Sequence, residues 1–343
     1  MPPKIFITGV TGYIAGDALH VLHQAHPDYS YAALARTQEK GDKVKAAYPN
    51  VRIVLGDLDN SEILEAEARK ADIVLHAADA SDHEGAAKAI AKGLAEGHSK
   101  ENPGFWLHTG GTGILTYFDS RDERFGEWDE KEFDDWSGVE ELTNLPDEAF
   151  HRNVDKIVLE AGVKYADSVK TAIVCPPTIY GKGRGPISGR SRQAYELTKV
   201  VLQKGYAPIT GNGKARWNNV HVHDLSDLFV LLVEAAVAKK LDAELWGAKG
   251  YYLAEHGEHV WADLSKLIAK TAAEKGYIGK DWKEYQMDQK EAFDIADFQA
   301  LSWGLNSRGK AERASKLLGW KPHRVSIEEE VPKIVQEEKD RLG

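Results

Sequence analysis

A glycine-rich turn joins two apolar segments of different periodicity at the beginning of this chain. Residues 4–8 (Lys-Ile-Phe-Ile-Thr) form a short apolar run typical of a buried strand, and apolar residues recur at helical spacing from Ile14 to Ala25. Gly9 and Gly12 lie between these segments. A strand, a glycine turn and a helix in this order present backbone N–H groups to an anion, which is the arrangement that binds a dinucleotide pyrophosphate. The sequence therefore predicts a dinucleotide-binding unit near the first residue.

The same alternation of strand and helix continues through the first half of the chain. We expect further strands at 31–36, 51–55, 71–77, 105–108 and 171–175, with helical patterns between most of them. This order predicts an α/β fold with a doubly wound parallel sheet, a Rossmann domain, over residues 1–180. Helices predominate afterwards, at 192–204, 224–239, 260–275, 310–318 and 327–341. We expect residues 181–343 to form a smaller, mainly helical substrate-binding region that is interleaved with the Rossmann core.

The end of the second strand indicates which dinucleotide is bound. It reads Ala35-Arg36-Thr37, without the acidic residue that accepts a hydrogen bond from the adenosine ribose of NAD. Because arginine forms a bidentate pair with a 2′-phosphate, we expect NADP, with NAD as the less favoured cofactor. Asp57 ends the third strand, where the adenine would lie.

The composition excludes several classes of protein. The formal net charge is −10, whereas proteins that bind nucleic acid or anionic membranes carry a basic surplus. The single cysteine, Cys175, excludes an internal disulfide and metal sites with several cysteines. A strand so close to the first residue leaves no room for a signal peptide, so we expect a cytoplasmic protein.

The whole net charge lies in one segment. Residues 119–148 contain 13 acidic and 3 basic side chains, and the rest of the chain contains 41 of each. Four aromatic residues are interspersed, namely Phe125, Trp128, Phe133 and Trp136. We expect an ordered acidic lid, anchored by these aromatics, with its carboxylates facing water. Such a rim would favour a small neutral or cationic substrate over a polyanion.

Several motifs resemble those of the short-chain dehydrogenase/reductase superfamily, in its extended or atypical branch of epimerase/dehydratase-like proteins. The matching stretches are Thr8-Gly9-x-x-Gly12-x-x-Ala15, Gly56-Asp57, His76-Ala77-Ala78, Thr109-Gly110-Gly111-Thr112, 175–181, 221–225 and 318–322. They span nearly the whole chain. Together, the glycine turn and the resemblance imply cofactor contacts from Thr8, Gly9, Thr11, Gly12, Tyr13, Ile14, Arg36, Asp57, Leu58, Ala77, Ala78, Thr109, Lys156, Pro176 and Thr178. The family analogy also suggests a homodimer.

The resemblance is incomplete at the catalytic positions. The family carries a tyrosine and, four residues later, a lysine that holds the nicotinamide ribose. Lys156 matches the lysine, but Arg152 replaces the tyrosine, and an arginine is a poor general acid and no general base. Because helical residues four apart share a face, we expect Arg152 and Lys156 to face one pocket.

Other residues are candidates to replace the missing tyrosine. Thr112 matches the family's serine or threonine and is expected to hydrogen-bond the substrate carbonyl. Tyr117 and His151 are the candidate proton donors, with Asp155 orienting His151 from one turn later.

Two further groups of residues resemble known functional sites. Tyr195 and Lys199 have the family's spacing, but they follow the sixth strand. His221 and His223 are expected to alternate on a strand and, with Asp224, resemble a metal-ligand set. Asp224 is better explained as the N-cap of the next helix, so no metal is expected. The glycine-rich, basic loop 181–190 is a candidate substrate flap.

These observations favour an NADP-dependent oxidoreductase that acts on a small carbonyl or alcohol. One alternative is a sugar-type epimerase or dehydratase that uses bound nicotinamide transiently. The other is a non-catalytic NADP-binding sensor or regulator, which the missing tyrosine supports directly.

Overall fold

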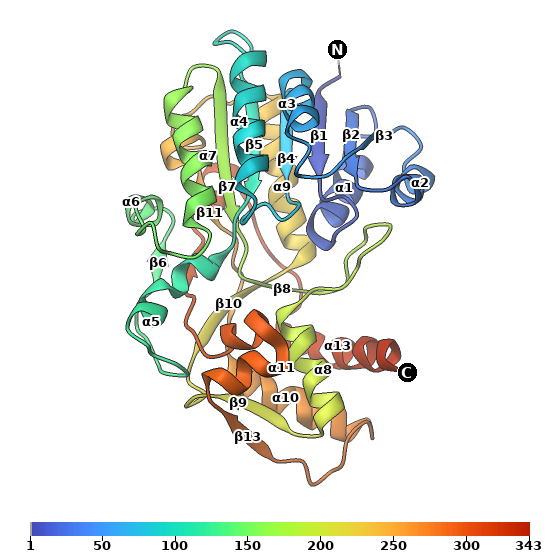
Figure 1. The fold of residues 1–343 in the computed structure, drawn as a ribbon, viewed down its shortest axis with the longest axis vertical. Helices are drawn as coiled ribbons and strands as arrows, with labels where there is room; N and C mark the ends of the chain where they lie inside the picture. Colours follow the sequence, from blue (N-terminus) through green and yellow to red (C-terminus); the bar gives the residue numbers. More distant parts are fainter. Residues whose placement is uncertain (1) are drawn as a thin grey trace.

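The computed structural model describes residues 2–343, and its largest element is a seven-stranded parallel sheet (Figure 1). The strands are β1 (Lys4–Thr8), β2 (Ser30–Ala35), β3 (Arg52–Leu55), β4 (Ile73–His76), β5 (Gly104–Thr109), β7 (Val169–Cys175) and β11 (Tyr251–Leu253). They lie side by side in the order β11-β7-β5-β4-β1-β2-β3, and each neighbouring pair is parallel. The chain order reverses between β1 and β4, which creates a crevice at the carboxyl ends of these strands.

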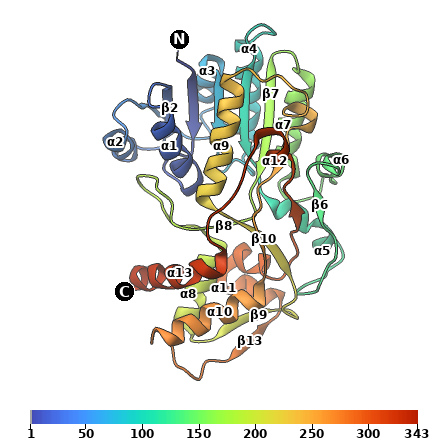
Figure 2. The same ribbon diagram turned by 180° about the vertical axis from the view of Figure 1, so that it is seen from behind.

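Helices cover both faces of the sheet, as Figures 1 and 2 show from opposite sides. One layer contains α1 (Tyr13–Ala25), α2 (Gln38–Ala47) and α9 (Val222–Val237), and the other contains α3 (Ser61–Lys70), α4 (Glu84–Gly97) and α7 (Arg152–Lys164). Successive strand side chains point to opposite faces, so Ile5 and Ile7 pack under the first layer and Phe6 under the second. The predicted doubly wound Rossmann fold is confirmed.

A smaller, mainly helical region lies beyond the carboxyl edge of the sheet (Figure 1). Its elements are β8 (Thr178–Tyr180), α8 (Gln193–Lys204), β9 (Ala207–Thr210), β10 (Arg216–His221), β12 (Glu258–Val260), α10 (Trp261–Glu274), β13 (Glu284–Met287), α11 (Gln289–Ser302) and α13 (Ile327–Leu342). β8, β10 and β12 form one small sheet, and β9 and β13 form another. Tyr195, Trp261 and Trp303 are buried in its core.

The second half of the chain also completes the Rossmann layers. β11 adds the last strand beside β7, and α9 packs on α1 through Leu228, Phe229 and Leu232. The short elements η2 (Gly247–Lys249) and α12 (Arg313–Leu318) lie close to these strands and helices. The two regions are therefore interleaved along the sequence.

The acidic segment 119–148 is ordered and tied down by its aromatic side chains. It begins within α5 (Tyr117–Arg121) and contains β6 (Phe133–Asp134) and α6 (Val139–Thr143), and β6 pairs with β14 (Gly309–Lys310). The guanidinium of Arg216 lies 3.2 Å from the ring centroid of Trp128, and that of Arg313 lies 5.3 Å from that of Trp136. The aromatic anchors that we expected are therefore present.

The segment is nevertheless not a lid whose carboxylates all face water. Asp119 is buried and accepts hydrogen bonds from the backbone N and the side-chain Nδ2 of Asn306, each at 2.7 Å. Asp135 is fully buried and accepts a hydrogen bond from Leu253 N at 3.0 Å. These carboxylates join segments that are distant in the sequence, so the segment acts as a brace.

Within residues 2–343, no helix combines the length and the apolar composition needed to cross a membrane.

Candidate functional site

Two adjoining cavities form a crevice at the carboxyl edge of the sheet. The first, of about 650 Å³, is lined by eight of the expected cofactor residues, namely Gly9, Thr11, Gly12, Arg36, Asp57, Leu58, Ala77 and Ala78. The second, of about 410 Å³, is lined by six of the expected residues, namely Tyr13, Ile14, Ala77, Thr112, His151 and Pro176. Ala77 and Arg192 line both cavities, so the two form one continuous site.

The glycine turn after β1 lets the segment after β4 pass close to its backbone. Gly9 has a φ of +83°, and a Cβ there would lie 2.8 Å from the backbone nitrogen of Ala78. The N–H of Gly12 donates to the carbonyl of Gly9 at 2.8 Å, which closes the turn immediately before α1. The first turn of α1 thus opens toward the first cavity, as the binding of a pyrophosphate requires. The geometry fits a dinucleotide.

Thr112 lies in the wall of the second cavity. It begins the short 3₁₀-helix η1 (Thr112–Thr116), and its backbone is held by bonds to Pro176 O and Ser307 Oγ. Its Oγ1 is buried and has no hydrogen-bond partner within the described chain. A buried hydroxyl without a partner is costly, so this atom is suited to bind a ligand oxygen.

His151 and Asp82 form a hydrogen-bonded pair at the same cavity. His151 is the N-cap of α7 with a φ of +68°, and its Nδ1 lies 2.7 Å from Asp82 Oδ1. Its Nε2 edge lies against Gly111 and Gly113. Burial raises the pKa of Asp82, but the hydrogen bond and charge of His151 and the hydrogen bond of Ser81 together outweigh it, so the net pKa is lowered. Asp82 is therefore a carboxylate that orients the imidazole.

The expected orienting residue, Asp155, has a different role. It is fully buried below Gly110 and accepts a hydrogen bond from Tyr251 Oη at 2.8 Å, and Cys175 Sγ donates to the same hydroxyl at 3.1 Å. Burial raises the pKa of Asp155 to about 6, although the Tyr251 hydrogen bond opposes the shift. Asp155 thus belongs to a buried polar chain under the site, and the prediction that it orients His151 is wrong.

Three other expected catalytic residues do not line the crevice. Lys156 Nζ binds both carboxylate oxygens of Asp147, at 3.0 and 2.9 Å, on the outside of the protein. Arg152 is the first residue of α7 and is buried, and its Nε and Nη1 have no partner in the described chain. Tyr117 packs under the guanidinium of Arg121. The prediction that Arg152 and Lys156 face one pocket is therefore not met by this arrangement.

Three expected cofactor residues lie beneath the crevice. Thr8 is buried, and its Oγ1 lies 2.7 Å from His76 Nδ1 and accepts hydrogen bonds from the N–H groups of Ala77 and Ala78. The hydroxyls of Thr109 and Thr178 are buried and have no partner within residues 2–343. Thr8 therefore shapes the turn from below.

Neither the pair Tyr195 and Lys199 nor the histidines His221 and His223 line the crevice. Tyr195 is buried, which raises its pKa further above its ordinary value, and Lys199 pairs with Glu196 at 3.2 Å. β10 ends at His221 and α9 begins at Val222, so His221 and His223 do not alternate on a strand. His221 is itself the N-cap of α9, since its Nδ1 accepts from His223 N at 3.1 Å. The N-cap prediction for Asp224 is therefore wrong.

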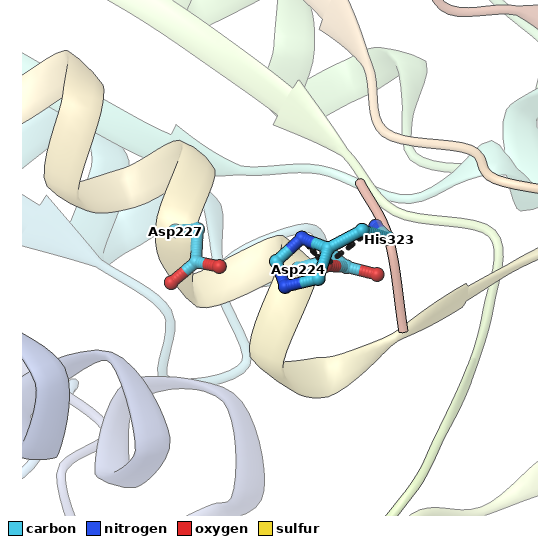
Figure 3. A group of neighbouring side chains, drawn as sticks. All are labelled: Asp224, Asp227 and His323. Carbon is cyan, nitrogen blue, oxygen red and sulfur yellow. Dashed lines mark hydrogen bonds and ion pairs between the residues drawn. The ribbon is translucent and has the colours of Figure 1, made fainter. Parts of the chain in front are cut away.

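Asp224 instead joins two segments of the chain. Its carboxylate accepts hydrogen bonds from the backbone N–H groups of His323 and Arg324, at 3.1 and 3.0 Å. With Asp227 it forms a cluster of side chains near His323 (Figure 3). The guanidinium of Arg324 lies 3.7 Å from Asp224 and 3.6 Å from Asp227 and supplies positive charge to this cluster.

The loop between β8 and α8 is fastened across α1. Arg184 forms a bidentate ion pair with the buried Asp17 of α1, at 3.0 and 2.7 Å, and its N–H also donates to Asp17 at 2.7 Å. Burial raises the pKa of Asp17, but these bonds outweigh it and the net pKa is lowered. Tyr13 Oη donates to Gly181 O at 2.5 Å. We call residues 181–192 the strap.

The comparisons with known proteins agree with this geometry. Residues 4–97 match a family model described as semialdehyde dehydrogenase, NAD binding domain. UDP-glucose 4-epimerase from Thermotoga maritima superposes with a TM-score of 0.65 at 15% identity, covering 99% of this chain and 100% of that one. The dTDP-glucose 4,6-dehydratase DesIV from Streptomyces venezuelae, solved with NAD bound, gives a TM-score of 0.66 at 16% identity and covers 98% and 97%.

Relatives with similar sequences span the same length. A protein named Oxidase ucsJ from an Acremonium species is 41% identical over 350 residues, covering 100% of this chain and 99% of its own. An uncharacterized protein of Schizosaccharomyces pombe is 26% identical and covers 93% and 95%. This chain belongs to the extended short-chain dehydrogenases/reductases. The resemblance seen in the motifs is confirmed, and this extended short-chain dehydrogenase/reductase carries a nicotinamide-dinucleotide-binding domain.

Sequence reasoning missed several residues that line the crevice. These are Leu34, Asp59, Asp79, His83, Gly113, Phe150, Ser191, Arg192, Gln193, Trp217, Phe298 and Gln299. Gly111, Pro177, Ile179 and Arg190 also line the crevice and belong to the matching motifs or to the loop 181–190 that the sequence singled out. Asp82, which binds His151, was missed as well. The aspartates and His83 follow β3 and β4 closely, so the rule that ligands bind at strand carboxyl ends could have found them.

Proposed function

We propose that this protein is an NADP-dependent oxidoreductase that acts on a small carbonyl or alcohol substrate. One observation carries the proposal: the free hydroxyl of Thr112 and the His151–Asp82 pair meet at the second cavity, beside the glycine turn of the first. The similarity to a protein named as an oxidase supports redox chemistry.

The site residues divide the chemistry between them. When bound, the nicotinamide exchanges a hydride with the substrate carbon. Thr112 Oγ1 donates a hydrogen bond to the substrate oxygen. His151 gives its Nε2 proton to that oxygen during reduction and takes it back during oxidation, while Asp82 holds Nδ1 protonated and fixes the ring.

Arg36 is the residue that we propose to bind the 2′-phosphate of NADP. It is exposed at the end of β2, lines the first cavity, and has no ion-pair partner in the part of the chain that the structure describes. We expect Arg36→Asp to weaken NADPH binding about 10- to 100-fold, since the bond is charge-assisted, and to change NADH binding about threefold at most. Lys43→Asp, an equal charge change on α2, is the control.

The measurement is the dissociation constant of each nucleotide from titration calorimetry. An NADPH/NADH preference that is the same in wild type and Arg36→Asp would contradict the role of Arg36. Failure of both nucleotides to bind would overturn the cofactor assignment.

A second candidate, a non-catalytic NADP-binding regulator, is favoured by Lys156, which binds Asp147 outside the crevice. Tight NADPH binding without consumption of NADPH in a panel of aldehydes, ketones and enones would support the regulator and contradict the oxidoreductase.

A further inference from the structure

The second cavity has an aromatic wall. The ring of Phe150 lies 3.6 Å from that of His151 and 4.6 Å from that of Phe298, measured between centroids. Phe150 and Phe298 remain 39% and 37% exposed, and Trp217 lines the same cavity. Large apolar side chains that stay open to solvent at a cavity mark a ligand-binding surface.

A break in α11 brings Phe298 to this wall. Ala296 and Asp297 leave the helical conformation, and Asp297 adopts a φ of +49° with a ψ of −142°. This backbone conformation is unfavourable for a residue other than glycine, so the surrounding packing must stabilise it. Phe293, before the break on the same helix, is also exposed but does not line the cavity.

Most polar side chains around the second cavity already bind other parts of the protein. Tyr13 donates to Gly181 O, Ser191 to Ile179 O, Gln193 to Ser302 Oγ, Trp217 to Leu305 O, and Arg190 to Glu338. Within the described chain, no carboxylate and no asparagine lines this cavity. The polar side chains at this cavity without such a bond are Thr112, Gln299 and Arg192, and His151 keeps its Nε2 free of any bond within the described chain.

This arrangement disfavours a sugar. A sugar ring carries several hydroxyls, and each hydroxyl that loses water without gaining a partner weakens binding. An aromatic or conjugated ring needs no such partners and gains from contact with other aromatic rings. Arg192 also lines the cavity, but it lies at the junction with the first cavity, where the cofactor phosphates belong in the proposed function.

We propose that the second cavity binds a planar, apolar carbonyl compound, with its ring against Phe150 and Phe298 and its oxygen at Thr112 and His151. This substrate class differs from the nucleotide-sugars named for the proteins of similar fold. It rests on the proposed function, because that function is what assigns the substrate oxygen to Thr112 and His151. A cavity of about 410 Å³ has the volume of a pocket for a molecule of one to three rings.

The test measures binding separately from turnover. The protein is saturated with NADP⁺, which cannot reduce a ketone, and is titrated calorimetrically with 2-acetylnaphthalene or with UDP-glucose. We expect 2-acetylnaphthalene to bind and UDP-glucose not to bind. Phe298→Ala should weaken the binding of 2-acetylnaphthalene about five- to tenfold, the usual value of an aromatic contact. Phe293→Ala is the matched control and should leave it unchanged.

The outcomes separate this inference from the function on which it rests. Equal binding of 2-acetylnaphthalene by wild type and Phe298→Ala, or tighter binding of UDP-glucose, would overturn the aromatic site. Phe298→Leu keeps an apolar side chain but removes the ring, and should show a loss even if the alanine variant folds poorly. If the compound binds through Phe298 but NADPH is not consumed in its presence, the aromatic site stands and the oxidoreductase function fails.

Discussion

The residue that faces the reacting end of the crevice is His151, immediately before the arginine at the family's tyrosine position. The left-handed backbone of His151 turns its side chain away from the helical face that carries Arg152 and Lys156. Lys156 consequently binds Asp147 at the surface. Motif alignment cannot reveal such a rotation, because His151 begins α7 with a left-handed backbone that redirects its side chain.

Substitutions in the His151–Asp82 pair should affect catalysis and not cofactor binding. We expect His151→Gln to lower kcat about 100- to 10,000-fold, the usual contribution of a positioned general acid. Asp82→Asn should lower it about 10- to 100-fold, since the imidazole loses its orienting carboxylate but keeps its donor.

Neither side chain lines the first cavity, so the dissociation constant of NADPH should stay within about threefold of wild type. Glu84→Gln, a nearby carboxylate that pairs with Lys88, is the control for the loss of charge. Wild-type kcat in His151→Gln, measured as NADPH consumption at saturating substrate, would remove His151 from the mechanism.

Elements with a strong local pattern were predictable, and those held by distant partners were not. The expected strand 4–8 is β1, and the expected helix 192–204 corresponds to α8 (Gln193–Lys204). β11 has three residues, and β8 has three as well, which is too short for a periodicity. The aromatic wall was missed for a related reason, because Phe150, Trp217 and Phe298 come from separate segments that only the tertiary fold brings together.

The strap illustrates the same limit at the level of one element. The glycines and basic residues of 181–190 predicted a substrate flap, whereas Arg184 fastens this loop to Asp17, which lies 167 positions earlier in the sequence. Arg184→Ala would leave the buried Asp17 carboxylate with Ser226 Oγ and one backbone N–H as its partners. Removing one partner of a buried ion pair costs about 3–5 kcal/mol, and the partial exposure of Arg184 places our expectation at about 2–3 kcal/mol.

Urea unfolding of wild type and Arg184→Ala measures this difference. The variant should also be cleaved faster by trypsin within residues 181–192, because the loop loses its anchor. Lys182→Ala is the control, since Lys182 is exposed and lies 3.9 Å from Glu337 in a weak surface pair. An unfolding midpoint for Arg184→Ala equal to that of Lys182→Ala would show that the strap is held by its other contacts.

Over the whole molecule, the surplus of acidic residues serves to brace the fold. Asp119, Asp129 and Glu132 pair with Arg124 or Arg308, and Asp135 binds the backbone of Glu312 and Arg313. The sequence shows where this negative charge lies, but it could not show that residues 306–313 pack against the segment and pair with its carboxylates. No residue of 119–148 lines the two cavities, so the charge of this segment does not set the substrate class.

The interleaving of the two regions predicts that residues 1–180 do not fold alone. A chain truncated after Tyr180 lacks β11 and α9, and therefore lacks Leu228, Phe229 and Leu232, which are fully buried against the sheet and α1. Each such side chain contributes about 1.5–3 kcal/mol on burial, and their loss together with that of a strand approaches the total of about 5–15 kcal/mol that stabilises a typical protein. We expect the truncated chain to show no cooperative thermal transition and no NADPH binding, whereas the full chain shows both. A single cooperative transition with NADPH binding by residues 1–180 would mean that the Rossmann half is an independent domain.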